Sequence, residues 1–234
     1  MSSDASRLIL FDIDQTLIFT AGAGLRCMAQ AILEVAGIDM TAIRVNPGGK
    51  TDPAILYEIF DAAGVSTNGQ RARVEAEVWR RYAECLGEEM ERADERRAVK
   101  PGIPSLLDAL QPHASLGLLT GNLEVTARIK LAAFDLNRYF PIGAYGSDSH
   151  DRNALGALAL ARAAAHYGRA FAARDTWVVG DTDRDIACAK AIGARVLAVA
   201  TGHQDVETLR AHAPDVVLED MADVESVKRV LLTF

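Results

Sequence analysis

Short apolar runs alternate with amphipathic segments along most of this 234-residue chain, and this alternation limits the possible folds strongly. The runs are rich in strand-forming residues and end at polar residues or glycine, as buried strands do. Apolar strands separated by helices favour a parallel sheet with helices on both faces. The predicted strands cover residues 8–11, 116–119, 142–145, 177–179, 196–199 and 216–218, and the predicted helices after residue 115 cover 123–134, 153–167, 184–192, 206–212 and 222–232.

The interval between the first two predicted strands is far longer than a crossover connection requires. About a hundred residues separate Asp14 from Leu116, whereas a crossover needs roughly a dozen residues plus its helix. Helical periodicity and helix-start signals account for most of the excess. The predicted helices of this interval cover residues 25–36, begin at the Asp52–Pro53 pair, and cover about 70–97.

These segments define the predicted fold. It is a three-layer, doubly wound α/β core with a parallel sheet, and an α-helical cap is inserted after the first strand. We expect the core domain to comprise residues 1–18 and 99–234, and the cap to comprise residues 19–98. The length suits one core of this kind with one insertion.

Charge and composition exclude several kinds of partner. The net charge of −7 opposes binding to the phosphates of a nucleic acid. We see neither a signal peptide nor an apolar stretch of membrane-spanning length, and therefore expect a cytoplasmic protein with no membrane partner. Cys27, Cys85 and Cys188 lack metal-ligand spacing. We expect them to be reduced thiols without a chemical role.

Polar residues directly follow three of the predicted strands. Ligands bind beyond these carboxyl ends in a doubly wound parallel sheet. Two carboxylates that are two apart on an extended strand can face the same side, as can two that are four apart at a helix start. The residues concerned are Asp12 and Asp14 after the first strand, Thr120, Gly121 and Asn122 after the second, and Asp181 and Asp185 after the fourth.

Carboxylates that converge at apolar strand ends repel one another, so they need a cation or raised pKa values. A set of oxygen ligands without His or Cys suits a hard cation such as Mg²⁺, which often binds together with a phosphate. We expect Asn122 to cap the helix that follows it, whose free N–H groups near Thr120 would favour an anion. A carboxylate nucleophile, a second carboxylate as proton donor and a metal suit phosphoryl transfer.

Three motifs resemble those of the haloacid dehalogenase superfamily. DIDQT at residues 12–16, LLTGN at 118–122 and GDTDRD at 180–185 resemble its first, second and fourth motifs. Their order, their spacing and their places at strand ends fit, and the resemblance covers essentially the whole chain. The position of the insertion resembles the helical cap of phosphoglycolate-phosphatase-like members.

The resemblance implies a role for each acidic residue. Asp12 would attack phosphorus and form an aspartyl-phosphate, and Asp14 would protonate the leaving alcohol and later activate water. Mg²⁺ would be held by Asp12, the main-chain carbonyl of Asp14, and Asp181, with Asp185 assisting directly or through water. An aspartate at position 14 is typical of the phosphatases in this superfamily rather than of its dehalogenases.

The resemblance also implies a phosphate site, and here the chain departs from the family pattern. Thr120 would bind the transferring phosphoryl group together with main-chain groups near Gly121 and Asn122. The third motif normally supplies a lysine before the helix after the third strand, but residues 131–189 contain none. Arg152 stands at about that place, and its planar fork suits phosphate.

A second departure lies in the first motif, where Gln15 replaces the usual glycine. A glutamine would be strained there if the turn requires a positive φ. In the cap, the loop that contains Gly49, Lys50 and Thr51 resembles the substrate-facing loop of cap-bearing phosphatases. The alternative is that Asp52 caps the next helix while Lys50 is solvated.

The expected function is Mg²⁺-dependent hydrolysis of a phosphate monoester on a small molecule, by a monomer or homodimer. A helical cap over the pocket favours a metabolite over a phosphoprotein. Three alternatives stay open. The first is a sugar phosphomutase on the same scaffold, the second is a phosphonate hydrolase in which Lys50 would form an imine with substrate, and the third is a non-catalytic phosphate-binding module.

Overall fold

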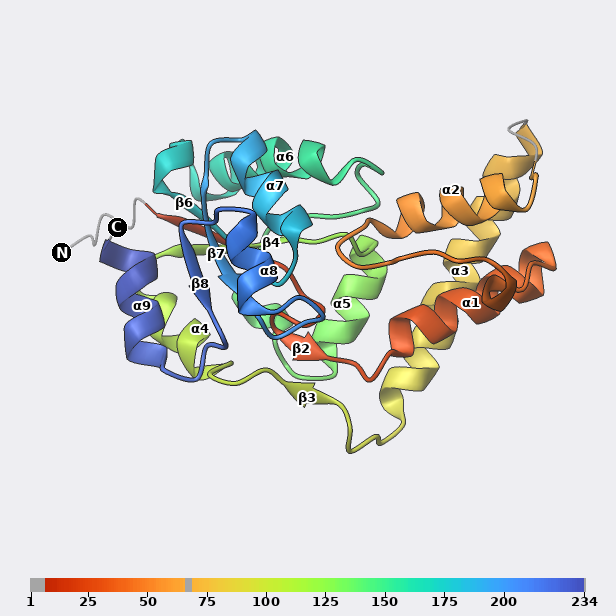
Figure 1. Cartoon of the computed structure of the whole chain (residues 1–234), viewed down its shortest axis with the longest axis horizontal. Helices are drawn as coiled ribbons and strands as arrows, with labels where there is room; N and C mark the ends of the chain where they lie inside the picture. The colour runs from red at the N-terminus through yellow and green to blue at the C-terminus, as the bar shows by residue number, and fades with distance from the viewer. Residues whose placement is uncertain (1–6, 66–68, 234) are drawn as a thin grey trace.

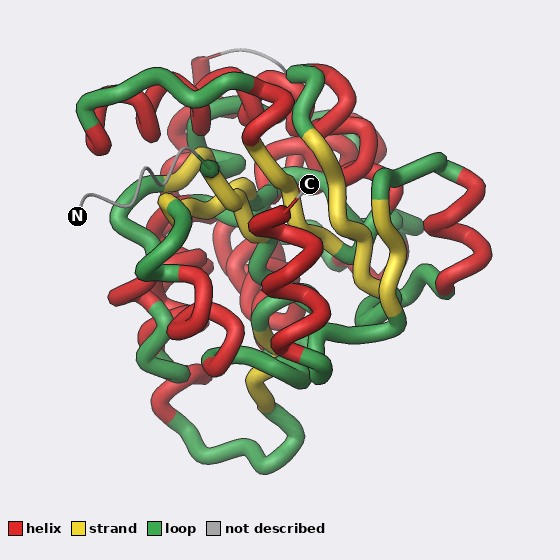
Figure 2. Tube along the Cα trace, turned by 90° about the vertical axis from the view of Figure 1, so that its left-hand side faces the viewer, coloured by secondary structure: helices red, strands yellow, loops and turns green. Residues whose placement is uncertain are grey.

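The computed structural model describes residues 7–65 and 69–233. Within these ranges a six-stranded parallel sheet has the strand order β5-β4-β1-β6-β7-β8, so the predicted α/β fold class is confirmed. Helices lie on both sides of the sheet when the molecule is seen end-on (Figure 2). The strands are β1 (Leu8–Phe11), β4 (Ser115–Leu119), β5 (Gly143–Ala144), β6 (Thr176–Gly180), β7 (Arg195–Val199) and β8 (Val216–Leu218).

The first strand occupies the centre of the sheet. Phe11 of β1 is in register with Leu118 of β4 on one side and with Val179 of β6 on the other. The pairing continues one residue further, because the N–H of Asp12 donates to the carbonyl oxygen of Val179 at 2.9 Å. Asp12 therefore stands where β1 ends, between the ends of its two neighbours.

Alternate residues of β1 face the two helical layers, as the pleat of a strand requires. Ile9 and Phe11 belong to one hydrophobic cluster and Leu8 and Leu10 to another, and all four are fully buried. The first cluster is covered by α4 (Ser105–Leu110), α5 (Glu124–Ala132) and α9 (Val224–Thr233), and the second by α6 (Arg152–Tyr167), α7 (Asp183–Ala191) and α8 (Val206–Ala211).

In the described part of the proposed cap there are three α-helices, and they lie at the end of the molecule opposite to α9 (Figure 1). They are α1 (Ala23–Ala36), α2 (Asp52–Ala62) and α3 (Gly69–Glu91), and they share a hydrophobic cluster of their own. The last ends at Glu91 and not near residue 97 as predicted. The chain turns there because the Asp94 carboxylate accepts a hydrogen bond from the N–H of Arg96, an alternative to helical bonding.

Two short strands that the sequence did not predict join the cap to the core. β2 (Ile18–Phe19) pairs antiparallel with β3 (Ala98–Val99), so the chain leaving the sheet lies beside the chain returning to it. This ribbon supports the proposed division into a core of residues 1–18 and 99–234 and a cap of residues 19–98.

None of the helices in the described part of the chain is long and apolar enough to cross a membrane. The 23-residue helix α3 instead carries charged residues that pair along its surface. Arg80, for example, forms ion pairs with Glu77 and Glu84.

The expectation of three reduced thiols is wrong for two of them. Cys27 of α1 and Cys85 of α3 form a disulfide, with their Cα atoms 5.5 Å apart. The packing of α1 against α3 brings these residues together although 58 positions separate them, and no local spacing could have indicated the pair. Cys188 is a buried free thiol, and burial raises its pKa to about 11.

The disulfide should stabilise the folded chain by restricting the unfolded one. Reduction is expected to lower the free energy of unfolding by about 2–4 kcal/mol, measured by urea titration with and without reductant. Thiol titration in denaturant should find one reactive cysteine before reduction and three after it. In the control variant Cys188→Ala, the number of reactive cysteines before reduction should fall to zero. Three reactive thiols in the unreduced wild type would contradict the pairing.

Candidate active site

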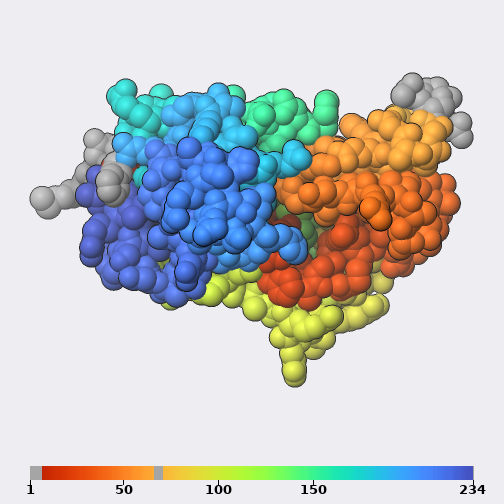
Figure 3. Space-filling model, in the orientation of Figure 1, coloured from red at the N-terminus to blue at the C-terminus, as the bar shows by residue number. Residues whose placement is uncertain are grey.

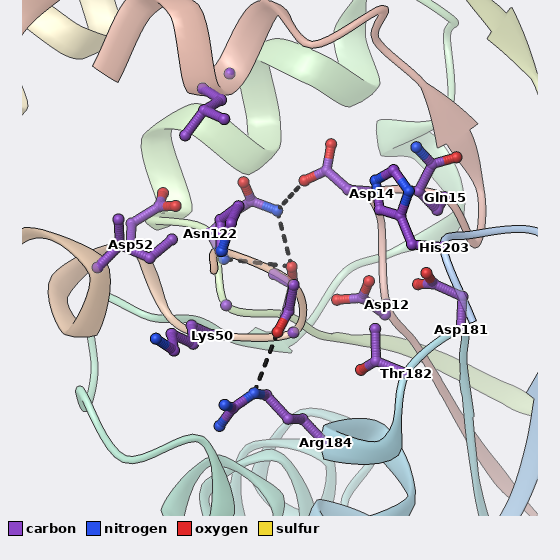
Figure 4. Close-up of a pocket in the computed structure, with 18 of the residues that line it drawn as sticks. Asp12, Asp14, Gln15, Lys50, Asp52, Asn122, Asp181, Thr182, Arg184 and His203 are labelled. Atoms are coloured by element: carbon purple, nitrogen blue, oxygen red, sulfur yellow. Dashed lines mark hydrogen bonds between the residues drawn. The ribbon is translucent and has the colours of Figure 1, made fainter. Parts of the chain in front are cut away.

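A cavity of about 550 Å³ lies at the carboxyl edge of the sheet, where the cap meets the core (Figures 3 and 4). Residues from both parts line it. The core contributes the loops after β1, β4, β6 and β7 together with Lys130 of α5 and Arg152 of α6, and the cap contributes residues of α1, α2 and α3 and the loop before α2. Most of the site residues predicted from the sequence are among the lining residues, as described below.

Three buried carboxylates converge at the sheet edge. Asp12 at the end of β1, Asp181 after β6 and Asp185 in the first turn of α7 each place an oxygen within 4.8 Å of the others. Burial raises the pKa of Asp12 and of Asp181 well above the ordinary range of an aspartate, and the neighbouring carboxylates raise both further. An oxygen-only cluster of this kind suits a hard divalent cation.

Asp14 points away from this cluster. Its Oδ2 accepts hydrogen bonds from Asn122 Nδ2 at 2.8 Å and from Lys130 Nζ at 2.6 Å, and its side chain is 39% exposed. Figure 4 shows the difference: Asp12 and Asp181 lie close together, whereas Asp14 turns toward Asn122. The carboxylate of Asp14 is therefore separate from the acidic cluster.

Arg152 is buried in the first turn of α6 and connects several parts of the site. Its Nη2 donates to Asp12 Oδ1 at 2.9 Å and also to Asp185. Its Nη1 donates to the carbonyl oxygen of Gly49 in the cap at 3.2 Å. The other oxygen of Asp185 accepts from the N–H and hydroxyl of Thr182 in a capping box that starts α7.

Thr120 and Asn122 form one hydrogen-bonded group with Asp14. Thr120 Oγ1 accepts from Asn122 Nδ2 at 2.9 Å, and Asn122 Oδ1 accepts from Lys130. Asn122 does not cap the following helix, contrary to our expectation, because these contacts occupy its side chain. The N-cap residue of α5 is Leu123, which has no side-chain cap bond of its own.

The cap loop before α2 rests closely on the core. Gly121 has no side chain there, and a Cβ at this position would lie 2.2 Å from the carbonyl oxygen of Lys50. Gly49 and Lys50 line the cavity but Thr51 does not. Thr51 is the N-cap of α2, since it accepts from the N–H of Ala54. Sequence reasoning had placed that cap at Asp52, which is the first residue of the helix.

Lys50 extends along the cavity wall. Its Nζ lies 2.5 Å from a carboxylate oxygen of Glu58, which belongs to α2. On the core side, Arg184 Nε donates to the carbonyl oxygen of Gly48 at 3.1 Å. Arg184 was not singled out from the sequence, where it reads as an ordinary helix-start arginine.

Asp52 joins the cap to the core. Its carboxylate accepts from the N–H of Leu123 at 3.0 Å, and its own N–H donates to the carbonyl oxygen of Gly121 at 2.7 Å. Burial raises the pKa of Asp52 to about 6, although the charge of Lys130 and the bond from Leu123 oppose the shift.

This raised pKa makes stability depend on pH. Folded Asp52 binds a proton more tightly than the unfolded residue, so its contribution to the free energy of unfolding falls as pH rises from about 4 to about 6. Asp52→Asn removes this dependence. Relative to wild type, the variant should gain up to about 3 kcal/mol over that window, measured by denaturant titration at a series of pH values. A difference in the free energy of unfolding between variant and wild type that stays constant with pH would contradict the prediction.

Gln15 adopts the left-handed conformation that usually favours glycine, with φ = 65°. Its side chain compensates, because Oε1 accepts from Lys100 Nζ at 2.7 Å. Lys100 also donates to the carbonyl oxygen of Thr201 at 2.7 Å, and Thr201 Oγ1 donates to the carbonyl oxygen of Gln15. The replacement of glycine is thus accommodated by contacts with the segments after β3 and β7.

Two substitutions separate these effects. Gln15→Ala keeps the left-handed backbone without the bond to Lys100, and should lower the free energy of unfolding by about 1–2 kcal/mol. Gln15→Gly loses the same bond but relieves the backbone, and should stay within about 1 kcal/mol of wild type. Both are measured by urea titration. An alanine variant as stable as the glycine variant would contradict the account.

Lys130 is a second residue of the site that sequence reasoning missed. It lies near the end of α5, is 3% exposed, and contacts both Asp14 and Asn122. The available signal was a lysine between Ile129 and Leu131 on a helix expected to pack against the sheet. A buried lysine needs a partner, but the sequence does not show which carboxylate lies above it.

A doubly wound parallel sheet with a cluster of acidic side chains at its carboxyl edge is an arrangement found in α/β enzymes that bind their ligands at that edge. The family model of the haloacid dehalogenase-like hydrolases matches residues 9–190. The chain therefore belongs to this hydrolase family, and the superfamily resemblance stated from the motifs is confirmed.

Comparisons with individual proteins agree. The chain is 27% identical over 222 residues to a phosphoglycolate phosphatase of Synechococcus elongatus, covering 92% of this chain and 94% of that one. It is 27% identical over 232 residues to a probable phosphatase, IndB, of Dickeya dadantii, covering 96% and 94%. The crystal structure of a predicted phosphoglycolate phosphatase from Haemophilus somnus superposes with a TM-score of 0.69 at 18% identity, covering 97% and 99%.

Proposed function

We propose that the chain is a Mg²⁺-dependent phosphatase that hydrolyses small-molecule phosphate monoesters through an aspartyl-phosphate on Asp12. The different positions of two carboxylates carry the proposal. Asp12 is buried beside Arg152, whereas Asp14 stands apart from the acidic cluster and lines the cavity. The two curated relatives, both named as phosphatases, support the same reaction.

In the first step an oxygen of Asp12 attacks phosphorus while the bond from phosphorus to the leaving oxygen breaks. Asp14 donates a proton to that oxygen, so the leaving group departs as an alcohol. In the second step a water oxygen attacks phosphorus and Asp14 takes its proton. The bond to Asp12 breaks, which releases inorganic phosphate and restores the carboxylate.

The transferring phosphoryl group would lie against the end of β4. We assign its contacts to the hydroxyl of Thr120, to main-chain groups at Gly121 and Asn122, and to the fork of Arg152. Three of these four residues follow one strand, and Arg152 reaches Asp12 directly. Positive charge beside the nucleophile stabilises the charge of the transferring group.

The acidic cluster fits a magnesium ion. Asp12, Asp181 and Asp185 offer only oxygen ligands, and burial raises the pKa of the first two because it disfavours their charged forms. A bound cation would compensate these charges. The main-chain carbonyl of Asp14 would add a further ligand. When bound, the ion would neutralise charge on the phosphoryl group.

The cap would limit the size of the substrate. Gly49 and Lys50 line the cavity, and we propose that they contact the substrate there, whereas we assign Thr51 to the start of α2. A cavity of about 550 Å³ fits a metabolite better than a segment of a folded phosphoprotein, which supports a small-molecule substrate.

Release of inorganic phosphate from a panel of small phosphate monoesters with added Mg²⁺ tests the function. Asp12→Asn should lose at least about 1000-fold in kcat because it removes the nucleophile. The matched control is Asp135→Asn, since the Asp135 side chain is 85% exposed and lies outside the cavity. It should retain wild-type activity.

Metal removal provides the second arm of this test. EDTA should abolish phosphate release by the wild type, and excess Mg²⁺ should restore it. Equal turnover by wild type and Asp12→Asn would rule out Asp12 as the nucleophile. Turnover that persists in EDTA would rule out the proposed metal dependence.

A further inference from the structure

Lys130 is a buried ammonium at the boundary between core and cap, and the proposed reaction assigns it no role. An ammonium has three N–H donors. Within the described residues, its acceptors are Asp14 Oδ2 and Asn122 Oδ1, each at 2.6 Å. One donor therefore remains for a group inside the cavity, which Lys130 lines.

The position of this ammonium relates it to the leaving group. Asp14, which would protonate the leaving oxygen, is in direct contact with Lys130. An oxygen on the carbon next to the ester carbon thus comes within hydrogen-bonding reach of Nζ when the leaving oxygen is at Asp14. The phosphoryl group itself would lie further away, near Asp12 and Arg152.

The cap side of the same cavity supports this relation. Leu25, Met28 and Ile55 line one part of it, and their side chains have no hydrogen-bond donors, whereas the polar cap residues Lys50, Asp52 and Tyr82 line other parts. An oxygen of the leaving group directed toward the apolar residues would lose its hydrogen bonds to water without replacement. Lys130 offers that oxygen a charged donor. The cavity therefore favours an oxygen on the side of the leaving group that faces Lys130 and disfavours one on the side that faces the apolar residues.

Gly24 on α1 leaves the space for this contact. A Cβ at Gly24 would lie 3.0 Å from Lys130 Nζ and 3.3 Å from Tyr82 Oη. The absence of a side chain at this cap position therefore lets the ammonium keep its place against α1. Lys130 Nζ, which would contact the substrate, thus lies where helix α1 of the cap meets the core.

We propose that Lys130 is a specificity-determining residue that donates a hydrogen bond to an oxygen on the carbon adjacent to the ester carbon of the substrate. This rests on the proposed phosphatase function. The substrates it selects are phosphate esters of alcohols with a hydroxyl or carboxylate at that carbon. Esters with a plain hydrocarbon there are poor substrates.

Three two-carbon esters test the proposal because they differ at this carbon alone. They are ethyl phosphate, 2-hydroxyethyl phosphate and 2-phosphoglycolate. The wild type should show at least about a 10-fold higher kcat/KM for one or both oxygen-bearing esters than for ethyl phosphate. Whichever of these two is preferred identifies the hydroxyl or the carboxylate as the group recognised.

Lys130→Met keeps the length of the side chain and removes its donors. It should lower kcat/KM for the preferred ester by about 10- to 100-fold more than for ethyl phosphate. Lys228→Met is the control, because Lys228 lies on α9 away from the cavity. It should keep the wild-type preference.

A second variant covers the case in which Lys130→Met does not fold, as judged by circular dichroism. Gly24→Ala places a methyl group against Nζ while the charge remains, and alanine favours the helix. It should also reduce the preference for the oxygen-bearing ester.

Two outcomes would overturn this inference but leave the proposed phosphatase function standing. The first is turnover of ethyl phosphate by the wild type as fast as the other two esters. The second is an equal loss on all three esters in Lys130→Met, which would show that Lys130 only supports Asp14. Absence of phosphate release from every monoester would overturn the proposed function as well, so the two failures are distinguishable.

Discussion

The structure depends on the burial of negative charge at one edge of an apolar sheet. Asp12, Asp181 and Asp185 lie within reach of one another where little water reaches them, and such a cluster is unfavourable unless cations compensate it. Arg152 supplies part of that compensation from the start of α6. Lys130 shows the converse case a short distance away, because here the cation is buried and pairs with the partly exposed carboxylate of Asp14. The site is thus two separate ion-paired groups, one at the nucleophile and one at the proposed proton donor.

The sequence predicted the fold to the extent that local patterns determine it. β1 and β8 have the predicted bounds, and the remaining strands of the sheet overlap the predicted runs, because apolar runs bounded by polar residues leave few alternatives. β2 and β3 were missed because each has two residues and is defined by the other. The Cys27–Cys85 pair depends on helix packing, which no short window of sequence contains.

The site shows the same limit. Residues that directly follow strands, such as Asp12 and Thr120, were placed at the right edge because the topology of a parallel sheet determines where strand ends meet. Lys130 was missed because its role comes from a partner 116 positions away in the chain. The helix-cap assignments failed for a related reason: Asn122 is engaged by Asp14, and Thr51 takes the cap position that was predicted for Asp52. Short polar side chains have several possible partners, and only tertiary contacts decide among them.

The three-way contact of Arg152 has a consequence for the energetics of the molecule. One guanidinium donates to Asp12, to Asp185 and to the carbonyl oxygen of Gly49 in the cap. Any anion that competes for this guanidinium changes how firmly the Gly49 loop is held. By thermodynamic reciprocity, the seating of that loop changes the affinity for the anion by the same factor. A lysine has no planar fork with which to span these groups, so an arginine at this position makes occupancy of the sheet edge and attachment of the cap loop a single linked equilibrium.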